Sequence, residues 1–218
     1  MIEAIKNGYD VHAATAATIY RKTIDEVQPD ERQRAKTINF SLIYGQGDEA
    51  TARSLGVSVP EAREIKANYF AHIPEARPFI RSVHSVVEGR GYVRNFYGRR
   101  RRLKTDEAYK APNALIQGCA ADYIKHKLVG MYKYIKYYNL DIKLINIVHD
   151  EVVIECHESC KEHLAVLRWL LSDFETFRVP ITAGVEIGKP SWGEKEEVTD
   201  MGFTPPENFE FMSYNVYS

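Results

Sequence analysis

Residues 30–45 read DERQRAKTINFSLIYG, and four side chains of this stretch recur every four residues: Arg32, Lys36, Phe40 and Tyr44, followed by Gly45. Four residues turn an α-helix by about 400°, so each of these side chains lies about 40° from the one before. They therefore form a slanting stripe on one helix face, with two cations, then two rings, then a glycine. This order suits a nucleoside triphosphate. Cationic side chains would bind its phosphates, flat aromatic rings would contact its base or sugar, and a glycine at the end would let the backbone approach closely. The alternative is an ordinary amphipathic helix with solvated basic residues and a buried aromatic pair.

The composition is that of a globular protein. The chain has 218 residues, of which 44% are hydrophobic and 27% charged, enough for one large domain or two small ones. No apolar run is long enough to span a membrane, and the N-terminus lacks the pattern of a signal peptide. We therefore expect a cytoplasmic location and no membrane partner. The three cysteines argue against a disulfide framework.

Charge is distributed unevenly although the net charge is only −1. Residues 90–104 contain seven basic side chains and no acidic one, whereas residues 194–218 contain six acidic side chains and one lysine. This asymmetry predicts a basic patch that faces phosphates and a separate acidic tail with scattered aromatic residues.

Periodicity and turn residues predict helices up to about residue 90 and a mixture of strands and helices after it. We expect a cap at Asp30 and a turn-rich connection over residues 54–59. The expected helices cover residues 10–21, 30–45, 60–73, 76–88, 112–137 and 158–177. The expected strands are a hairpin at 92–102 and the segments 142–148, 152–156 and 181–187, with an extended tail beyond 192.

His149, Asp150 and Glu151 join two of the predicted strands. Two adjacent carboxylates at a tight turn between apolar strands are costly unless a counter-charge neutralises them. A divalent metal with oxygen ligands is the natural counter-charge, and Mg²⁺ usually takes one or two carboxylates together with substrate phosphates. The alternative is a solvent-exposed acidic turn.

Taken together and in order, these motifs resemble the C-terminal half of the polymerase domain of the bacterial DNA polymerase I-like family, family A. The strongest matches are the stripe that ends in Tyr44-Gly45 and the segment Val148-His149-Asp150-Glu151. Further matching segments are Asp10-Val11-His12, Gly91-Tyr92-Val93, Gly98-Arg99-Arg100-Arg101 and Asn113-x3-Gln117-Gly118-x-Ala120-Ala121-Asp122. The resemblance extends from about residue 1 to about residue 193. It implies a protein of the cytoplasm of a bacterium or a phage-infected cell, with an organelle as the alternative.

The resemblance implies an α+β fold, built from fingers helices and part of the antiparallel palm sheet of a right-hand polymerase. Residues 1–90 would form the fingers, with the nucleotide-binding helix at about 30–45. Residues 91–193 would form the C-terminal part of the palm, with a metal-binding hairpin at 142–156, and residues 194–218 the acidic aromatic tail.

The resemblance also implies a role for each matching residue in template-directed DNA synthesis. The catalytic residues would be Asp150, which binds Mg²⁺, Glu151, which assists it, and Lys36, which could protonate the departing pyrophosphate. The incoming dNTP would bind His12, Arg32, Lys36, Phe40 and Tyr44. The DNA primer-template would bind Arg99, Arg100, Arg101, Asn113, Gln117 and His149.

One feature of the family has no counterpart in the sequence, namely a segment reading roughly Asp-Tyr-Ser-x-x-Glu that carries a second metal-binding aspartate. Two-metal phosphoryl transfer needs carboxylates on both sides of the metal pair. We therefore expect this chain to be inactive alone, either as one part of a split polymerase whose companion polypeptide carries the thumb and the first palm aspartate, or as a fragment of a longer polymerase. Two other functions stay open: a non-catalytic DNA-binding accessory subunit, and a fragment of a single-subunit RNA polymerase.

Overall fold

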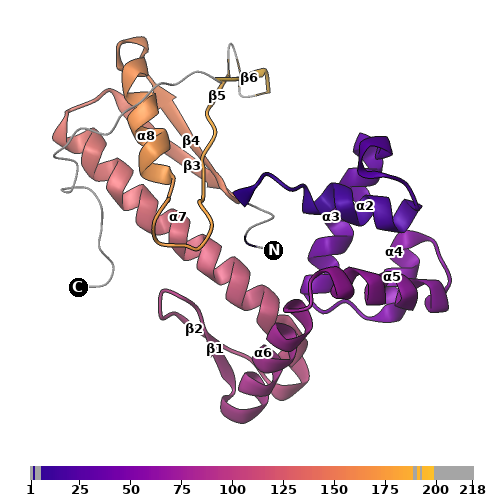
Figure 1. The fold of residues 1–218 in the computed structure, drawn as a ribbon. Helices are drawn as coiled ribbons and strands as arrows, with labels where there is room; N and C mark the ends of the chain where they lie inside the picture. Colours follow the sequence, from indigo (N-terminus) through magenta and orange to yellow (C-terminus); the bar gives the residue numbers. More distant parts are fainter. Residues whose placement is uncertain (1, 3–5, 189–190, 192, 199–218) are drawn as a thin grey trace. The chain divides into compact units, whose positions relative to one another are not determined.

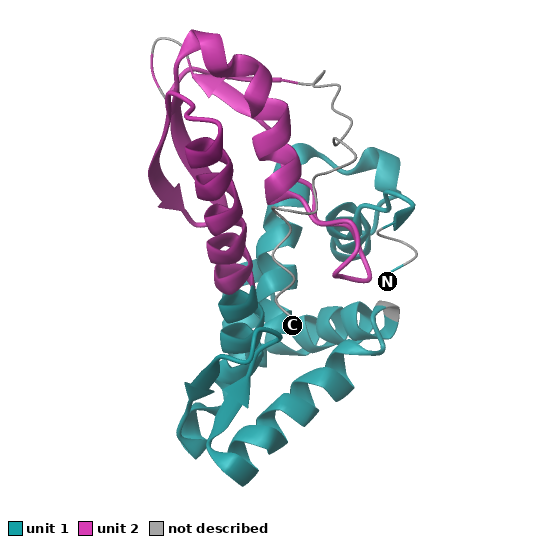
Figure 2. Ribbon diagram, turned by 90° about the vertical axis from the view of Figure 1, so that its left-hand side faces the viewer, with its two compact units in different colours: residues 1–119 teal, residues 120–218 magenta. Residues whose placement is uncertain are grey.

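The structure is a computed structural model that describes residues 2, 6–188, 191 and 193–198. The chain divides into two compact units, residues 1–119 and residues 120–218, which Figure 2 colours separately. The longest helix, Ala111–Tyr137, contributes residues to both units.

Helices dominate the first unit, which also contains the β1–β2 hairpin, and the other strands lie in the second unit (Figure 1). The α-helices are α2 (Val11–Tyr20), α3 (Pro29–Ile43), α4 (Asp48–Leu55), α5 (Val59–His72), α6 (Ala76–Arg90), α7 (Ala111–Tyr137) and α8 (Leu164–Leu171). The strands are β1 (Tyr92–Arg94), β2 (Arg100–Arg102), β3 (Ile142–Val148), β4 (Glu151–Cys156), β5 (Glu186–Gly188) and β6 (Lys195–Glu197). Short 3-10 helices are η1 (Ile24–Glu26), η2 (Thr105–Lys110) and η3 (Glu158–His163).

Helices α2 and α3 begin at polar caps. The Asp10 side chain accepts hydrogen bonds from the backbone N–H groups of His12, at 2.9 Å, and Ala13, at 3.0 Å, which satisfies the free end of α2. Helix α3 begins at Pro29, and Gln28 forms a capping box with Glu31. The prediction that Asp30 caps α3 is wrong, because the preceding proline is already helical and Asp30 lies in the first turn.

Helix α3 packs its apolar face against α5. Ile38 and Leu42 of α3 form a buried cluster with Tyr69, Phe70 and Ile73. The stripe helix is therefore attached to the unit by the face that lies opposite its charged and aromatic side chains.

Helix α4 lies in a stretch for which the sequence patterns predicted no helix. Gly56, with a φ of 68°, ends it in the left-handed conformation. The Asp48 carboxylate accepts hydrogen bonds from two cations of α5, the Nζ of Lys66 at 2.7 Å and the Nε of Arg63 at 2.9 Å. A helix of eight residues is marginal by itself, so contacts with α5 decide that it forms.

The predicted hairpin at residues 92–102 is confirmed. Strands β1 and β2 pair antiparallel, with Val93 opposite Arg101, and the chain enters β1 from α6 through Gly91, whose φ is 74°. Val83, Val87, Val93, Leu103 and Ala111 share one buried cluster. The basic hairpin is thus fixed to α6 and to the start of α7.

The second unit packs the later turns of α7 and helix α8 around the β3–β4 hairpin. Its buried cluster includes Met131, Ile142, Leu164, Leu167 and Leu170. The long helix predicted at 112–137 and the two predicted strands are confirmed, and Glu151 is the first residue of β4 rather than part of the turn.

Two predictions about the end of this unit are wrong. The helix expected to reach residue 177 ends at Leu171, because the Asp173 carboxylate accepts the backbone N–H groups of Glu175, at 3.2 Å, and Thr176, at 2.8 Å, a local turn that competes with helix. The strand expected at 181–187 is reduced to a bridge between Asp173 and Ile181 and to β5. Strand β5 pairs with β6, which lies in the predicted acidic tail; most of that tail, from residue 199 on, is outside the described residues.

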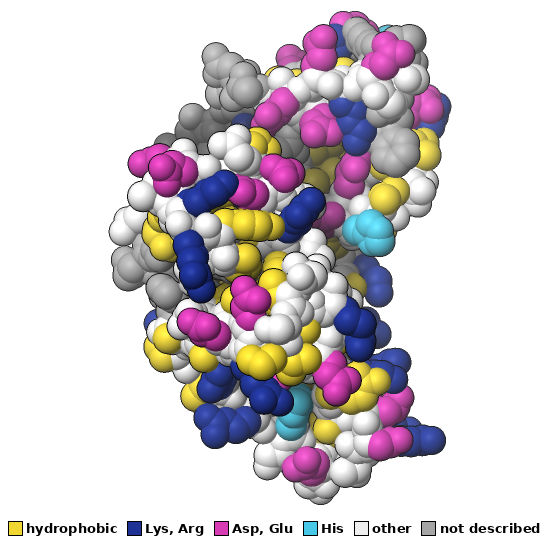
Figure 3. Space-filling view, turned by 90° about the vertical axis from the view of Figure 1, so that its right-hand side faces the viewer, with side chains coloured by type: hydrophobic (Ala, Val, Ile, Leu, Met, Phe, Trp, Pro, Cys, Tyr) yellow, Lys and Arg dark blue, Asp and Glu magenta, His cyan; other side chains and the backbone are white. Residues whose placement is uncertain are grey.

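The predicted fold class, α+β, is confirmed by these helices and by the small antiparallel sheets among the described residues. Acidic and basic side chains are interspersed on the face shown in Figure 3, in keeping with the small net charge. Within the described part of the chain, no helix is both long and apolar enough to cross a membrane.

Candidate nucleotide and DNA site

The predicted stripe lies on the exposed side of α3. Arg32 and Phe40 are exposed and Lys36 is half-buried, whereas Ala35, Ile38, Asn39 and Leu42 are buried on the opposite side. The rings of Phe40 and Tyr44 are stacked at an interplanar angle of 20°, with centroids 6.2 Å apart. Tyr44 is the residue that ends the helix, and Gly45, with a φ of 84°, turns the chain away. The cations and rings thus occupy one continuous, accessible face.

Helix α2 adds His12 to this face. The His12 ring lies 5.9 Å from the Phe40 ring, tilted by 49°. Asn39 lies 2.8 Å from Nδ1 of His12 through its Nδ2 atom, and the Arg32 Nε donates to Asp10 Oδ2 at 2.6 Å. Four of the five predicted nucleotide-binding residues, His12, Arg32, Phe40 and Tyr44, are therefore linked by contacts, and Lys36 lies between them on α3.

The pKa values of Asp10 and His12, at the α2 end of the site, are both lowered. Burial raises the pKa of Asp10, but hydrogen bonds from Arg32 and from the backbone of Ala13 and His12 outweigh it, so the net pKa is lowered and the carboxylate stays charged. Burial lowers the pKa of His12, and the nearby Arg32 and Lys36 lower it further, against the opposing charge of Asp10. The lowered pKa favours a neutral imidazole at His12, beside the cations Arg32 and Lys36.

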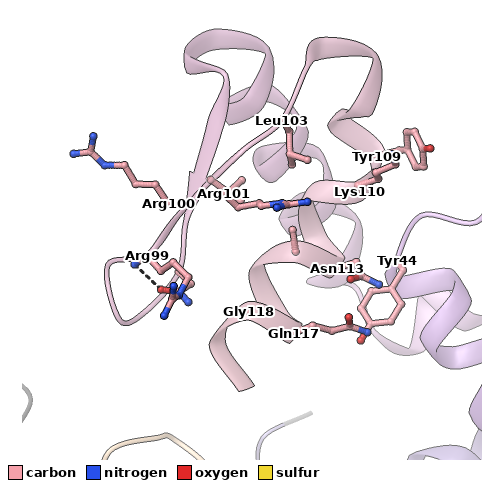
Figure 4. Close-up of a pocket in the computed structure, with 13 residues that line it drawn as sticks. Tyr44, Arg99, Arg100, Arg101, Leu103, Tyr109, Lys110, Asn113, Gln117 and Gly118 are labelled. Atoms are coloured by element: carbon pink, nitrogen blue, oxygen red, sulfur yellow. Dashed lines mark hydrogen bonds between the residues drawn. The ribbon is translucent and has the colours of Figure 1, made fainter. Parts of the chain in front are cut away.

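The predicted DNA-binding residues of the basic hairpin line a pocket in the first unit (Figure 4). The pocket has a volume of about 770 Å³ and is bounded by the hairpin, η2 and the first turns of α7. Tyr44 shares it with Asn113 and Gln117 of α7, so the end of the stripe and the predicted DNA contacts meet there. Figure 4 shows Arg101 pointing across the pocket and Arg100 pointing away from it.

The buried side-chain amide of Asn95 helps to hold the hairpin that carries the arginines. The Asn95 Oδ1 accepts the backbone N–H of Arg99 at 2.9 Å, the bond drawn dashed in Figure 4. The Arg100 guanidinium lies over the Tyr92 ring at 5.2 Å and Arg90 lies over the same ring at 4.6 Å, a cation–π geometry. Arg100 and Arg101 therefore lie on opposite sides of β2, and Arg101 is the one directed into the pocket.

The acidic hairpin lies in the second unit. Val148 pairs with Glu151, which leaves His149 and Asp150 as a two-residue turn. His149 has a φ of 57°. Asp150 is exposed and forms no hydrogen bond or ion pair with any other described residue. The Glu151 carboxylate, in contrast, accepts a hydrogen bond from the Nζ of Lys195, on β6, at 2.8 Å.

The chemistry of this turn fits one side of a magnesium site. The Asp150 carboxylate supplies oxygen ligands, which Mg²⁺ prefers, and no cation of the described residues occupies it. Among the described residues, no group of three or more His, Cys, Asp and Glu side chains is placed to hold a metal. Further ligands would therefore come from phosphates, water or carboxylates beyond this set.

Sequence reasoning missed three residues that hold these side chains. Asp10 caps α2 and binds Arg32, Asn39 contacts His12, and Lys195 binds Glu151. Aspartate often caps helices, but the link from Asp10 to Arg32 joins residues 22 positions apart. Asn39 and Lys195 carried no local signal, because their partners are 27 and 44 positions away.

Comparison with known proteins extends the similarity over nearly the whole described chain. The model of DNA polymerase family A matches residues 1–194. The chain is 32% identical over 205 residues to DNA polymerase I of Borreliella burgdorferi and 33% identical over 205 residues to DNA polymerase I of Pseudomonas aeruginosa. Each alignment covers 89% of this chain and 22% of the relative, so the chain spans about a fifth of the length of these relatives.

A solved structure has a similar fold. It is the polymerase domain of Pol1 from M. smegmatis, in complex with DNA primer-template and dNTP. It matches with a TM-score of 0.77 and 32% sequence identity, over 83% of this chain and 34% of that one. The family resemblance inferred from the motifs is confirmed, and this chain belongs to DNA polymerase family A.

Proposed function

We propose that this chain supplies the incoming-nucleotide site and one metal-binding side of a template-directed DNA polymerase. The reaction is attack of a primer 3′-hydroxyl on the α-phosphate of a dNTP, with release of pyrophosphate. The observation that carries the proposal is the exposed face of α3, where Arg32, Lys36, Phe40 and Tyr44 follow one another beside His12.

In this proposal the cationic end of the face binds the triphosphate. Arg32 and Lys36 attract the phosphate oxygens, and His12 adds a hydrogen bond. Lys36 has no ion-pair partner among the described residues, so its ammonium group is available to protonate the leaving pyrophosphate. The stacked rings of Phe40 and Tyr44 bind the sugar and base end.

The primer-template binds the basic hairpin and the start of α7. Arg99, Arg100 and Arg101 contact phosphates, which fix the register of the duplex without reading its sequence. Asn113 and Gln117 share a pocket with Tyr44, and their amides can donate to base or sugar acceptors beside the new base pair. His149 contacts the primer end from the acidic turn.

Asp150 binds the metal and Glu151 assists it. Bound Mg²⁺ neutralises charge on the phosphates and favours ionisation of the 3′-hydroxyl. One exposed carboxylate cannot form both sides of a two-metal site, so the second aspartate and the thumb come from another part of the enzyme, either a companion polypeptide or the rest of a longer chain. Ile145 and Ile147 of β3 support this proposal, because they are 56% and 43% exposed on a two-stranded sheet that more of a palm could cover.

Substitution of Asp150 tests the proposal. In an assembly of this chain with a polypeptide that carries the thumb and the first palm aspartate, Asp150→Asn should reduce primer extension by about 100-fold or more. The fold should persist, because Asp150 is exposed. Asp141→Asn, a matched exposed acid at the other end of β3, should extend primers normally.

Two results would contradict this account. Primer extension by the highly purified chain alone would show that no second carboxylate is needed. An assembly that keeps its activity after Asp150→Asn would exclude a catalytic role for the turn and favour an accessory DNA-binding function. Comparison of dNTP with NTP incorporation by the same assembly separates a DNA polymerase from an RNA polymerase.

A further inference from the structure

A buried amide links the two helices of the nucleotide site. Asn39 is only 2% exposed, and its Nδ2 lies 2.8 Å from the Nδ1 of His12. Asn39 is on the buried side of α3, next to Phe40 of the exposed stripe. Asn39 therefore contacts the His12 ring from the buried side of α3. The other ring nitrogen of His12, Nε2, is left for another partner.

The hydrogen-bond inventory favours one orientation of this amide. With Nδ2 facing His12, the Asn39 NH₂ group donates one hydrogen bond, and the Oδ1 atom is the group without a partner among the described residues. In the reverse orientation, Oδ1 would be satisfied but both N–H groups of the amide would be buried without an acceptor. Unpaired buried N–H groups are rarer than unpaired carbonyl oxygens, so the orientation in the structure is the better one.

The imidazole that receives this hydrogen bond has a lowered pKa, which favours its neutral form. Burial is the main cause, and the charges of Arg32 and Lys36 act in the same direction, against the charge of Asp10. A neutral imidazole has a single proton, and it is on the nitrogen that does not accept a hydrogen bond. Which nitrogen carries the proton decides whether His12 offers a donor or an acceptor to the nucleotide.

We infer that Asn39 selects the tautomer of His12 that carries its proton on Nε2, and that it thereby makes His12 a hydrogen-bond donor to the triphosphate. The donor role rests on the proposed function, since it requires a phosphate at this face. Asn39 is a positioning residue, because it acts through His12 and does not itself contact the nucleotide. In the other tautomer, Nε2 would have a lone pair and would repel phosphate oxygens.

The tautomer can be measured on the chain itself, without DNA or catalysis. Long-range ¹H–¹⁵N NMR spectra distinguish the two ring nitrogens, and we expect the Nε2–H form for His12 in the unmodified chain at pH 7.5. His163, whose Nδ1 lies 2.7 Å from the Tyr134 hydroxyl oxygen in the second unit, is the internal control. An Nδ1–H tautomer for His12 would overturn the inference, whatever the function of the chain.

Two substitutions test whether Asn39 is the cause. Asn39→Asp replaces the donor with a carboxylate that accepts, so His12 should move its proton to Nδ1 or become charged. Asn39→Leu removes the donor at similar volume and should give a mixture of tautomers. A His12 spectrum that stays unchanged in the folded Asn39→Leu variant would contradict the inference. Circular dichroism and unchanged amide signals of α5, which packs on α3 in the first unit, establish that the variant is folded.

Binding of dATP then connects the tautomer to the nucleotide. A hydrogen bond to a charged group is worth about 10- to 100-fold in affinity, so Asn39→Leu and His12→Ala should each weaken dATP binding by at least about 10-fold. Equal dATP affinity in the unmodified chain and Asn39→Leu would contradict the donor role. If His12→Ala also bound dATP normally, the proposed nucleotide role of His12 would fail, while the effect of Asn39 on the tautomer would stand.

Discussion

His149 adopts a backbone conformation that most L-residues avoid. Its φ of 57° lies in the left-handed region, which costs a non-glycine residue about 1–2 kcal/mol. The strain occurs at the two-residue turn that also holds Asp150, and strained backbone is often found at sites where function requires a particular side chain. We therefore expect the His149 side chain to serve function at this turn rather than stability.

We predict that His149→Gly stabilises the second unit and impairs the assembled enzyme. Glycine removes the steric cost but adds chain entropy, so the free energy of unfolding should rise by about 0.5–1 kcal/mol. Denaturant titration measures this change, and primer extension by the assembly measures the loss of the primer contact. Asn139→Gly is the matched control, since Asn139 has a φ of 47° but tolerates it well; an equal gain there would argue against special strain at His149.

At the scale of the element, α3 separates stability from binding on its two faces. Leu42 is 1% exposed and belongs to the apolar cluster, whereas Phe40, two residues earlier, is 43% exposed. The burial of one side therefore holds the helix while the other side remains open to a ligand.

Alanine substitutions at Leu42 and Phe40 should affect different properties, stability in the first case and nucleotide binding in the second. Leu42→Ala should lower the free energy of unfolding by about 2–5 kcal/mol, because it leaves a cavity. Phe40→Ala should change stability little but weaken dNTP binding, because its ring is exposed beside Tyr44. Denaturation midpoints and nucleotide titrations measure the two effects. Strong destabilisation by Phe40→Ala would show that the aromatic pair belongs to the core.

The basic hairpin allows a test of phosphate contacts by salt dependence. Arg101 points across the pocket, so Arg101→Ala should weaken binding of primer-template DNA and reduce the slope of log K against log salt concentration by about 1. Fluorescence anisotropy over a range of salt concentrations measures this slope. Arg63→Ala, which removes an exposed cation paired with Asp48, should leave the slope unchanged. A similar loss in both variants would indicate a non-specific charge effect.

At the scale of the whole molecule, each buried cluster of the described residues lies within one compact unit, two in the first unit and one in the second. Leu42 belongs to a cluster of the first unit, and Met131, which is 1% exposed, belongs to the cluster of the second. Damage to one core should therefore loosen mainly the elements packed on it.

We predict that Met131→Ala accelerates amide hydrogen exchange in β3, β4 and α8 but not in α3. Loss of the buried side chain should lower the stability of the second unit by about 2–5 kcal/mol. Leu42→Ala should give the reverse pattern, with faster exchange in α3 and α5. Mass spectrometry of exchanged peptides distinguishes these patterns, and uniform acceleration throughout the chain in both variants would show one cooperative unit in place of two.

Local patterns predicted most elements of the fold. Four-residue spacing predicted α3 and its exposed stripe, and β-branched runs on either side of a short polar turn predicted β3 and β4. Helix α4 and the early end of α8 were not predictable in this way, because α4 depends on ion pairs from α5 to Asp48 and α8 ends at a side-chain turn formed by Asp173.

The sequence by itself determined which residue types share a face, where the acidic turn lies, and to which family the motifs belong. These properties depend on spacing along one helix or one hairpin. Only the tertiary structure decided that Asn39 contacts His12, that Asp10 binds Arg32 and that Tyr44 shares a pocket with Gln117. These partners are far apart in the chain, so they meet only after burial of apolar faces has brought their helices together.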